Sequence, residues 1–116
     1  MGFESTCHCG ALRATIEGDI PNEGMACNCS ICGRKGHILH FVPAEQATIE
    51  AADTALGDYT FNKHAIHHHF CKTCGCSPFA TGQAPDGNAM VVVNLRCVTD
   101  CDVEALSITK VDGASF

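Results

Sequence analysis

Cysteines are the side chains of this sequence most able to carry chemistry, because there are ten of them in 116 residues. Most fall into three short groups: CHC at 7–9, CNCSIC at 27–32 and CKTCGC at 71–76. A density of about 9% in a short chain indicates either a disulfide framework or metal sites. The redox state of the compartment decides between these two interpretations.

The N-terminal segment MGFESTCHCG does not fit a secretory signal, because Glu4 interrupts it and it has no apolar core of about seven residues or more. No apolar run in the chain approaches the about 18 residues of a membrane-spanning helix. We therefore expect a cytoplasmic protein with no membrane partner. Reduced cysteines in such a compartment favour metal binding over the disulfide alternative.

Two cysteine pairs from distant parts of the chain, CHCG and CKTCG, each sit in a tight segment that contains glycine. This is the usual construction of a tetrahedral zinc site with four sulfur ligands. A structural zinc contributes on the order of 10–16 kcal/mol, comparable to the about 5–15 kcal/mol net stability of a domain. That contribution matters in a chain with six Phe, one Tyr and no Trp. The predicted ligands are Cys7, Cys9, Cys71 and Cys74.

The segment CNCSICGRKG brings three more thiols together, Cys27, Cys29 and Cys32, and no fourth Cys or His follows closely enough to close a tetrahedron locally. A zinc ion with three protein ligands keeps one position open to water or substrate, which distinguishes catalytic from structural zinc. We therefore predict that these three residues bind a second zinc and are the catalytic residues. The alternative is a second structural site, closed by a histidine or by one of Cys76, Cys97 and Cys101.

The chain is acidic, with a formal charge of −6, and its longest basic cluster is the pair Arg34-Lys35. Affinity for nucleic acid depends on basic residues that neutralise phosphates, so a nucleic-acid partner is not expected. Four-thiolate and three-thiolate zinc sites would bring the charge to about −9, and an anionic substrate would then need local cations. The candidate residues for holding its carboxylates are Arg34, Lys35 and Arg96.

Short alternating apolar segments predict a mostly β fold of antiparallel strands, with one domain over residues 1–116. The expected strands lie within 11–17, 37–42, 58–61, 67–70, 89–95 and 105–111. Helices should be single turns, after Pro43 and around 102–106. Turns are expected at 21–22, 57–58 and 85–88.

The histidines of the run 67–69 alternate along their expected strand, which places His68 on one face and His67 with His69 on the other. We interpret them as packing or surface residues.

At its cysteine motifs the chain resembles the glutathione-dependent formaldehyde-activating enzyme family, whose related proteins include centromere protein V. The matching segments follow the family's order and spacing from about Cys7 to Leu106: CHCGALRATIEG, CNCSICGRKG, FVPAE, YTFNKHAIHHHFCKTCGCSPF and VVVNLRCV. The resemblance implies an Mss4-like fold of small β-sheets around a structural zinc. It also implies the same division of the cysteines between a structural and a second zinc site.

The resemblance further implies an activity, the condensation of glutathione with formaldehyde to S-(hydroxymethyl)glutathione, classed as a carbon–sulfur lyase reaction in reverse. We therefore predict a zinc-dependent enzyme of this type, acting on a thiol such as glutathione and on formaldehyde or a related aldehyde. Holding a thiolate beside its carbonyl partner makes a slow bimolecular addition fast without a strong general base. The alternative function is a non-catalytic, zinc-stabilised module that binds a protein partner.

Overall fold

The computed structural model describes residues 2–28, 30–60, 66–83 and 86–111 of the chain, and in these residues ten strands form two sheets. The three-stranded sheet has the order β1-β2-β5, with bounds Gly2–Thr6, Leu12–Glu17 and Ala47–Ala51. The seven-stranded sheet has the order β10-β3-β4-β9-β8-β7-β6. Its strands are β3 Glu23–Cys27, β4 Leu39–Pro43, β6 Leu56–Tyr59, β7 His67–Cys71, β8 Phe79–Gln83, β9 Ala89–Asn94 and β10 Ser107–Val111.

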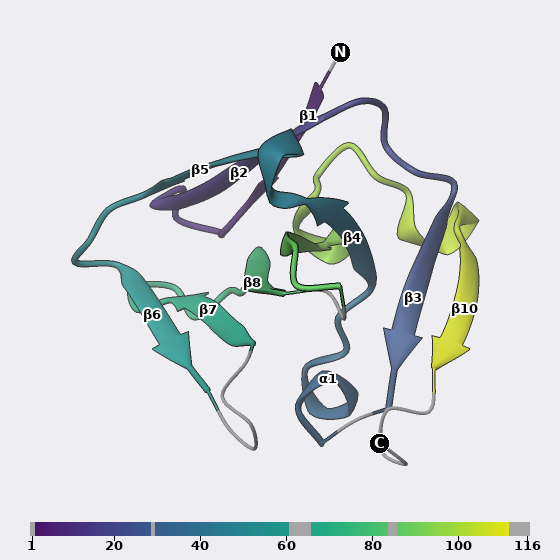
Figure 1. Cartoon of the computed structure of the whole chain (residues 1–116). Coiled ribbons are helices and arrows are strands. Elements are labelled where there is room, and N and C mark those ends of the chain that lie inside the picture. The colour runs from purple at the N-terminus through teal and green to yellow at the C-terminus, as the bar shows by residue number, and fades with distance from the viewer. Residues whose placement is uncertain (1, 29, 61–65, 84–85, 112–116) are drawn as a thin grey trace.

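The mostly β prediction is confirmed, and all but one of the strand pairs in the described residues are antiparallel. The exception is β10, which pairs with β3 in parallel, so that Lys110 lies opposite Ala26. In Figure 1 the β6–β7 pair and the β3–β10 pair lie on opposite sides of the molecule, with α1 (Ser30–Lys35) below the centre between them.

Four short helices interrupt the strands in the described part of the chain. The expected single turns after Pro43 and around 102–106 are confirmed as the 3₁₀ helices η1 (Ala44–Gln46) and η3 (Val103–Ala105). Asp102 caps η3, because its Oδ1 accepts a hydrogen bond from the Glu104 amide at 3.2 Å. The sequence did not predict α1 or η2 (Leu95–Cys97), since each is too short to show a helical period.

The strands expected within 11–17, 37–42, 67–70, 89–95 and 105–111 are confirmed as β2, β4, β7, β9 and β10. The segment 58–61 forms the end of β6 up to Tyr59, whereas Phe61 lies outside the described residues. The turn expected at 57–58 is wrong, because both residues belong to β6. The lack of a side chain at Gly57 makes room for the Phe70 ring, because a Cβ at this position would lie 2.4 Å from that ring.

The core lies between the two sheets and is filled mainly from β2 and β9. Leu12 and Ile16 from β2 pack with Val93 and Leu95, and all four have no exposed surface. Ser5 on β1 is equally buried and donates hydrogen bonds to the carbonyl oxygens of Pro78 at 2.8 Å and Asn94 at 3.3 Å. These bonds tie the small sheet to the segment that leads into β8.

Candidate metal centres and active site

The four cysteines of the two distant pairs meet in one cluster. The sulfur atoms of Cys7, Cys9, Cys71 and Cys74 all lie within 4.8 Å of one another. Cys9 Sγ lies 3.7 Å from Cys7 Sγ and 3.5 Å from Cys71 Sγ. A tetrahedral zinc with sulfurs at about 2.3 Å needs sulfur–sulfur separations of about 3.8 Å. Donor type, donor number and spacing therefore fit a zinc ion.

Two turns bring these sulfurs together. Between β1 and β2, the Cys7 amide donates to Leu12 O at 3.1 Å and the Gly10 amide donates to Cys7 O at 3.3 Å. After β7, the Gly75 amide donates to Cys71 O at 2.8 Å. Gly10 and Gly75 have φ values of 85° and 84°, in the left-handed region that other residues adopt only with strain.

Backbone amides already favour thiolates in this cluster. The amides of Cys76 and Cys9 lower the pKa of Cys74 to about 5, and the amide of Cys74 lowers the pKa of Cys71. For Cys9 the Ala11 amide favours the thiolate, but hydrogen bonding to the Cys71 sulfur and burial raise the pKa to about 12. The closeness of the four sulfurs thus keeps the Cys9 thiol protonated, and a divalent cation bound there would displace this proton.

The second group of cysteines lies where β3 ends and α1 begins. Cys27 is the last residue of β3 and Cys32 lies in α1, and both line the same two cavities. Cys29, the third predicted ligand, lies outside the described residues. The Gly36 amide donates to Cys32 O at 2.9 Å, and Gly36 ends α1 with a φ of 70°.

The first cavity has a volume of about 360 Å³ and a mostly apolar lining. Its apolar side chains come from β3, α1, β4, β8 and β9, and include Met25, Ile31, Leu39, Phe41, Phe79 and Val92. The polar residues that line it are fewer, among them Lys35, His37, His68, Ser77 and Asn94. We call this the apolar cavity.

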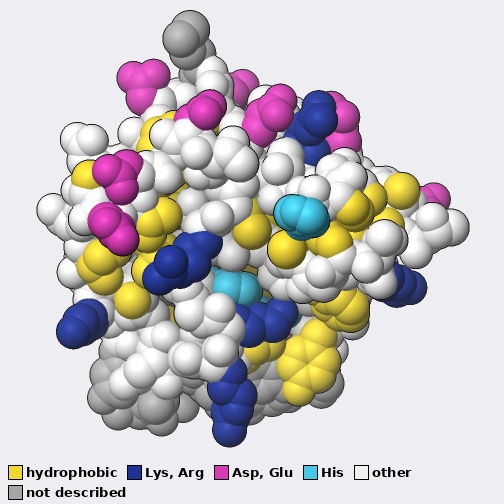
Figure 2. All heavy atoms as spheres, turned by 180° about the vertical axis from the view of Figure 1, so that it is seen from behind, with side chains coloured by type: hydrophobic (Ala, Val, Ile, Leu, Met, Phe, Trp, Pro, Cys, Tyr) yellow, Lys and Arg dark blue, Asp and Glu magenta, His cyan; other side chains and the backbone are white. Residues whose placement is uncertain are grey.

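The second cavity, of about 470 Å³, adjoins the first and is more polar. Cys27, Cys32 and His37 line both cavities, while Arg96 and Lys110 line the second alone. We call this the basic cavity. Figure 2 shows Lys and Arg side chains gathered around a histidine in the middle of one face, with Asp and Glu along its upper part.

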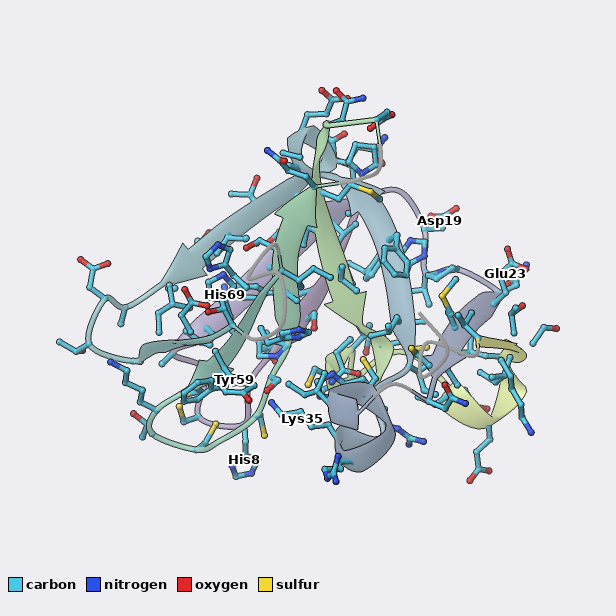
Figure 3. All side chains as sticks on the ribbon, turned by 60° about the horizontal axis from the view of Figure 1, so that its bottom comes forward. His8, Asp19, Glu23, Lys35, Tyr59 and His69 are labelled. Carbon is cyan, nitrogen blue, oxygen red and sulfur yellow. The ribbon has the colours of Figure 1, made fainter. Side chains whose placement is uncertain are left out.

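Of the three cations predicted from the sequence, two line the cavities. Lys35 lines the apolar cavity, where its Nζ donates to Ser77 Oγ at 2.9 Å and lies 6.0 Å from the centre of the Phe70 ring. Figure 3 shows it reaching from α1 toward the β6–β7 pair. Arg96 lines the basic cavity, and its Nε donates to Gly36 O at 2.6 Å. Arg34 lines neither cavity and stays a prediction.

Sequence reasoning missed Lys110 and His37. Lys110 reaches the basic cavity only because β10 pairs in parallel with β3, and no local sequence pattern predicts that pairing. For His37 a signal existed, since it directly follows CGRKG. Burial, followed by the nearby charges of Lys35, His68 and Arg96, lowers the pKa of His37 to about 4. Its imidazole is therefore neutral at pH 7.

The histidine run divides between two faces, as the alternation predicted. The rings of His67 and His69 stack with centroids 6.1 Å apart, and His67 Nδ1 lies 2.8 Å from Asp58 Oδ2 at the surface. His68 and His69 both line the apolar cavity, and burial lowers the pKa of His68. Our interpretation of all three as packing or surface residues stays a prediction.

The remaining cysteines do not support closure of the second site by a fourth cysteine, and closure by a histidine stays a prediction. Cys76, Cys97 and Cys101 line neither cavity. Cys97 Sγ accepts a hydrogen bond from Asn94 Nδ2 at 3.6 Å, and burial, with the charges of Cys76, Cys7 and Cys74, raises its pKa to about 11. Seven of the described cysteines are free thiols, so the disulfide alternative is wrong for them: Cys7, Cys9, Cys71, Cys74, Cys76, Cys97 and Cys101.

None of the helices in the described residues combines the length and apolar character needed to span a bilayer.

A β fold with a four-cysteine cluster that could hold a metal ion, and with a second, cavity-lining cysteine group, defines a class of protein, and comparison with known families identifies it. The family model described as "Glutathione-dependent formaldehyde-activating enzyme" matches residues 2–109. The chain therefore belongs to this family, as its motifs predicted. A crystal structure of a Rhodobacter sphaeroides protein is similar, with a TM-score of 0.75 and 24% sequence identity over 91% of this chain and 99% of that one. At this identity the likeness shows a shared fold.

Proposed function

We propose that this protein adds the thiol of glutathione to formaldehyde or a related aldehyde, and releases them in the reverse, carbon–sulfur lyase direction. We also propose that residues 1–116 form one domain, which works in the cytoplasm, where cysteines stay reduced. The observation that carries the proposal is the position of Cys27 and Cys32 at the junction of the apolar and basic cavities. Family membership supports the reaction type.

Two zinc sites are part of this proposal. The cluster of Cys7, Cys9, Cys71 and Cys74 would hold a structural zinc, because its sulfur spacing fits a closed tetrahedron. The set of Cys27, Cys29 and Cys32 would hold a second zinc, which keeps a thiol in its reactive thiolate form. That set is the proposed active site.

The chain's own residues bind and orient the substrates. Arg96 and Lys110 supply positive charge in the basic cavity, which suits the carboxylates of glutathione. Lys35 supplies the ammonium group on the apolar side, where we propose that it faces the aldehyde oxygen rather than a carboxylate. His37 borders both cavities as a neutral imidazole, so a ring nitrogen can accept a hydrogen bond without adding to the positive charge.

The test compares Cys32→Ser with Cys101→Ser in zinc-loaded protein. Turnover of glutathione and formaldehyde, above the uncatalysed rate, should fall at least tenfold in Cys32→Ser and stay unchanged in Cys101→Ser. Metal analysis should give two zinc ions per chain in the parent and in Cys101→Ser, one of them exchangeable. Equal turnover in both variants would overturn the proposal, and two inert zinc ions without turnover would favour the protein-binding module.

A further inference from the structure

The apolar cavity is larger and more apolar than the proposed substrates require. Formaldehyde has two heavy atoms and no chain, so its size is comparable to that of water, which occupies about 30 Å³ in the liquid. The cavity measures about 360 Å³. Glutathione fits most of this cavity poorly, because the few polar residues in the lining are outnumbered by apolar side chains, which offer no partners to its two carboxylates, its ammonium group and its amides.

The arrangement of the cavities separates a polar substrate from an apolar one. The basic cavity contains Arg96 and Lys110, and the apolar cavity contains neither. Cys27, Cys32 and His37 line both, so a thiol held on one side and a carbonyl held on the other meet beside the same residues. Glutathione therefore fits the basic side, which leaves the apolar side to the aldehyde.

We propose that the aldehyde accepted by this protein carries an apolar chain of several carbons, and that this chain lies in the apolar cavity. The inference rests on the proposed function and names its substrate class. Phe41 supports it, since this large apolar side chain lines the cavity and 43% of its surface is exposed. Covering that ring and its neighbours Leu39 and Val92 would remove apolar surface from water.

The covalent step is balanced without an oxidant or reductant. The sulfur of glutathione forms a bond to the carbonyl carbon, and the π bond of the carbonyl breaks toward oxygen. The proton lost from the thiol is matched by one gained at the new hydroxyl group. The product is a hemithioacetal, whose apolar chain stays in the cavity while Lys35 is placed to interact with the oxygen.

The experiment measures kcat/KM for formaldehyde, propanal, butanal, pentanal and hexanal at one fixed glutathione concentration. Each rate is corrected for the uncatalysed reaction. Burial of one methylene corresponds to about fourfold in kcat/KM, so the value should rise about fourfold per carbon from propanal to hexanal. A maximum at formaldehyde, with a fall along the series, overturns this inference and leaves the proposed function intact. No turnover with any aldehyde overturns both.

A variant that reduces the cavity gives a second readout. Ala80 on β8 lines the apolar cavity, so Ala80→Leu should lower the hexanal-to-formaldehyde ratio of kcat/KM at least tenfold. Ile49→Ala is the matched control, because Ile49 is exposed on β5 in the other sheet and should leave the ratio unchanged. Calorimetry with 1-hexanol as an unreactive probe should show binding to the parent and weaker binding to Ala80→Leu. Equal binding by both proteins would contradict the assignment of the cavity.

Discussion

Lys35 donates a hydrogen bond from Nζ to Ser77 Oγ at 2.9 Å, and this bond links the two cysteine sites. Lys35 ends α1, which carries Cys32, whereas Ser77 follows the CKTCGC segment of the four-cysteine cluster. Ser77 is itself held in place, because its carbonyl oxygen accepts a hydrogen bond from Asn94 Nδ2 at 3.0 Å. The ammonium group that lines the apolar cavity is therefore positioned by the segment that follows the four-cysteine cluster.

Lys35→Met should lower kcat by at least tenfold, because it removes the cation that we place beside the developing negative charge on the aldehyde oxygen. KM for glutathione should change less than threefold, since Arg96 and Lys110 lie in the other cavity. Steady-state kinetics in both substrates measures this split. Arg13→Met is the charge-matched control, because Arg13 pairs with Glu4 on the small sheet. A rise in KM for glutathione with kcat unchanged would instead make Lys35 a carboxylate ligand.

Removal of metal from the four-cysteine cluster should unfold the protein. The interaction that is lost, on the order of 10–16 kcal/mol, is comparable to the whole net stability of a domain, about 5–15 kcal/mol. Cys71→Ser should therefore lose its cooperative thermal transition in circular dichroism, and strong chelators should do the same to the parent. Cys101→Ala should keep a cooperative transition, since Cys101 lies outside the cluster. A folded, metal-free Cys71→Ser protein would contradict a structural role.

The cluster was predictable from the sequence because each half is local. Cys7 with Cys9, and Cys71 with Cys74, are brought together by turns whose glycines stand in the sequence, and two such pairs are the usual construction of a metal site with four sulfur ligands. The strands were predictable for a similar reason. Apolar residues alternate along β2 and are continuous along β9, so each pattern can be recognised within a few positions.

The cavities were not predictable, since their residues come from strands that are distant in sequence. Lys110 depends on the parallel pairing of β10 with β3, and Phe79 and Val92 depend on the pairing of β8 with β9. Gly57 shows the opposite error. Its position before Asp58 suggested a turn, but its lack of a side chain serves the close approach of Phe70 on the neighbouring strand.

His37→Gln should make the protein less sensitive to mild acid. The pKa of His37 is lowered to about 4 by burial and by Lys35, His68 and Arg96, below the usual 6.5, so between these values the unfolded chain binds more protons. Stability is therefore lost as pH falls from about 6.5 to 4. The decrease in Tm from pH 7 to pH 5 should be smaller in the variant by roughly 3 °C. His67→Gln changes a histidine at the surface and controls for metal loss in acid. An identical decrease in Tm in the parent, His37→Gln and His67→Gln would contradict the prediction.

Gly57→Ala should lower the free energy of unfolding by about 1–3 kcal/mol, the usual cost of overpacking. The added Cβ would lie 2.4 Å from the Phe70 ring, and Gly57 is buried in β6, paired with Phe70 on β7, so that neither strand can move away freely. Urea unfolding of Gly57→Ala, Phe70→Leu and the double variant measures the coupling between the two positions. If the clash is the cause, Gly57→Ala should cost at least 1 kcal/mol less when Leu replaces Phe70. If the losses in the free energy of unfolding add in the double variant, the Phe70 ring is not the reason that this position requires glycine.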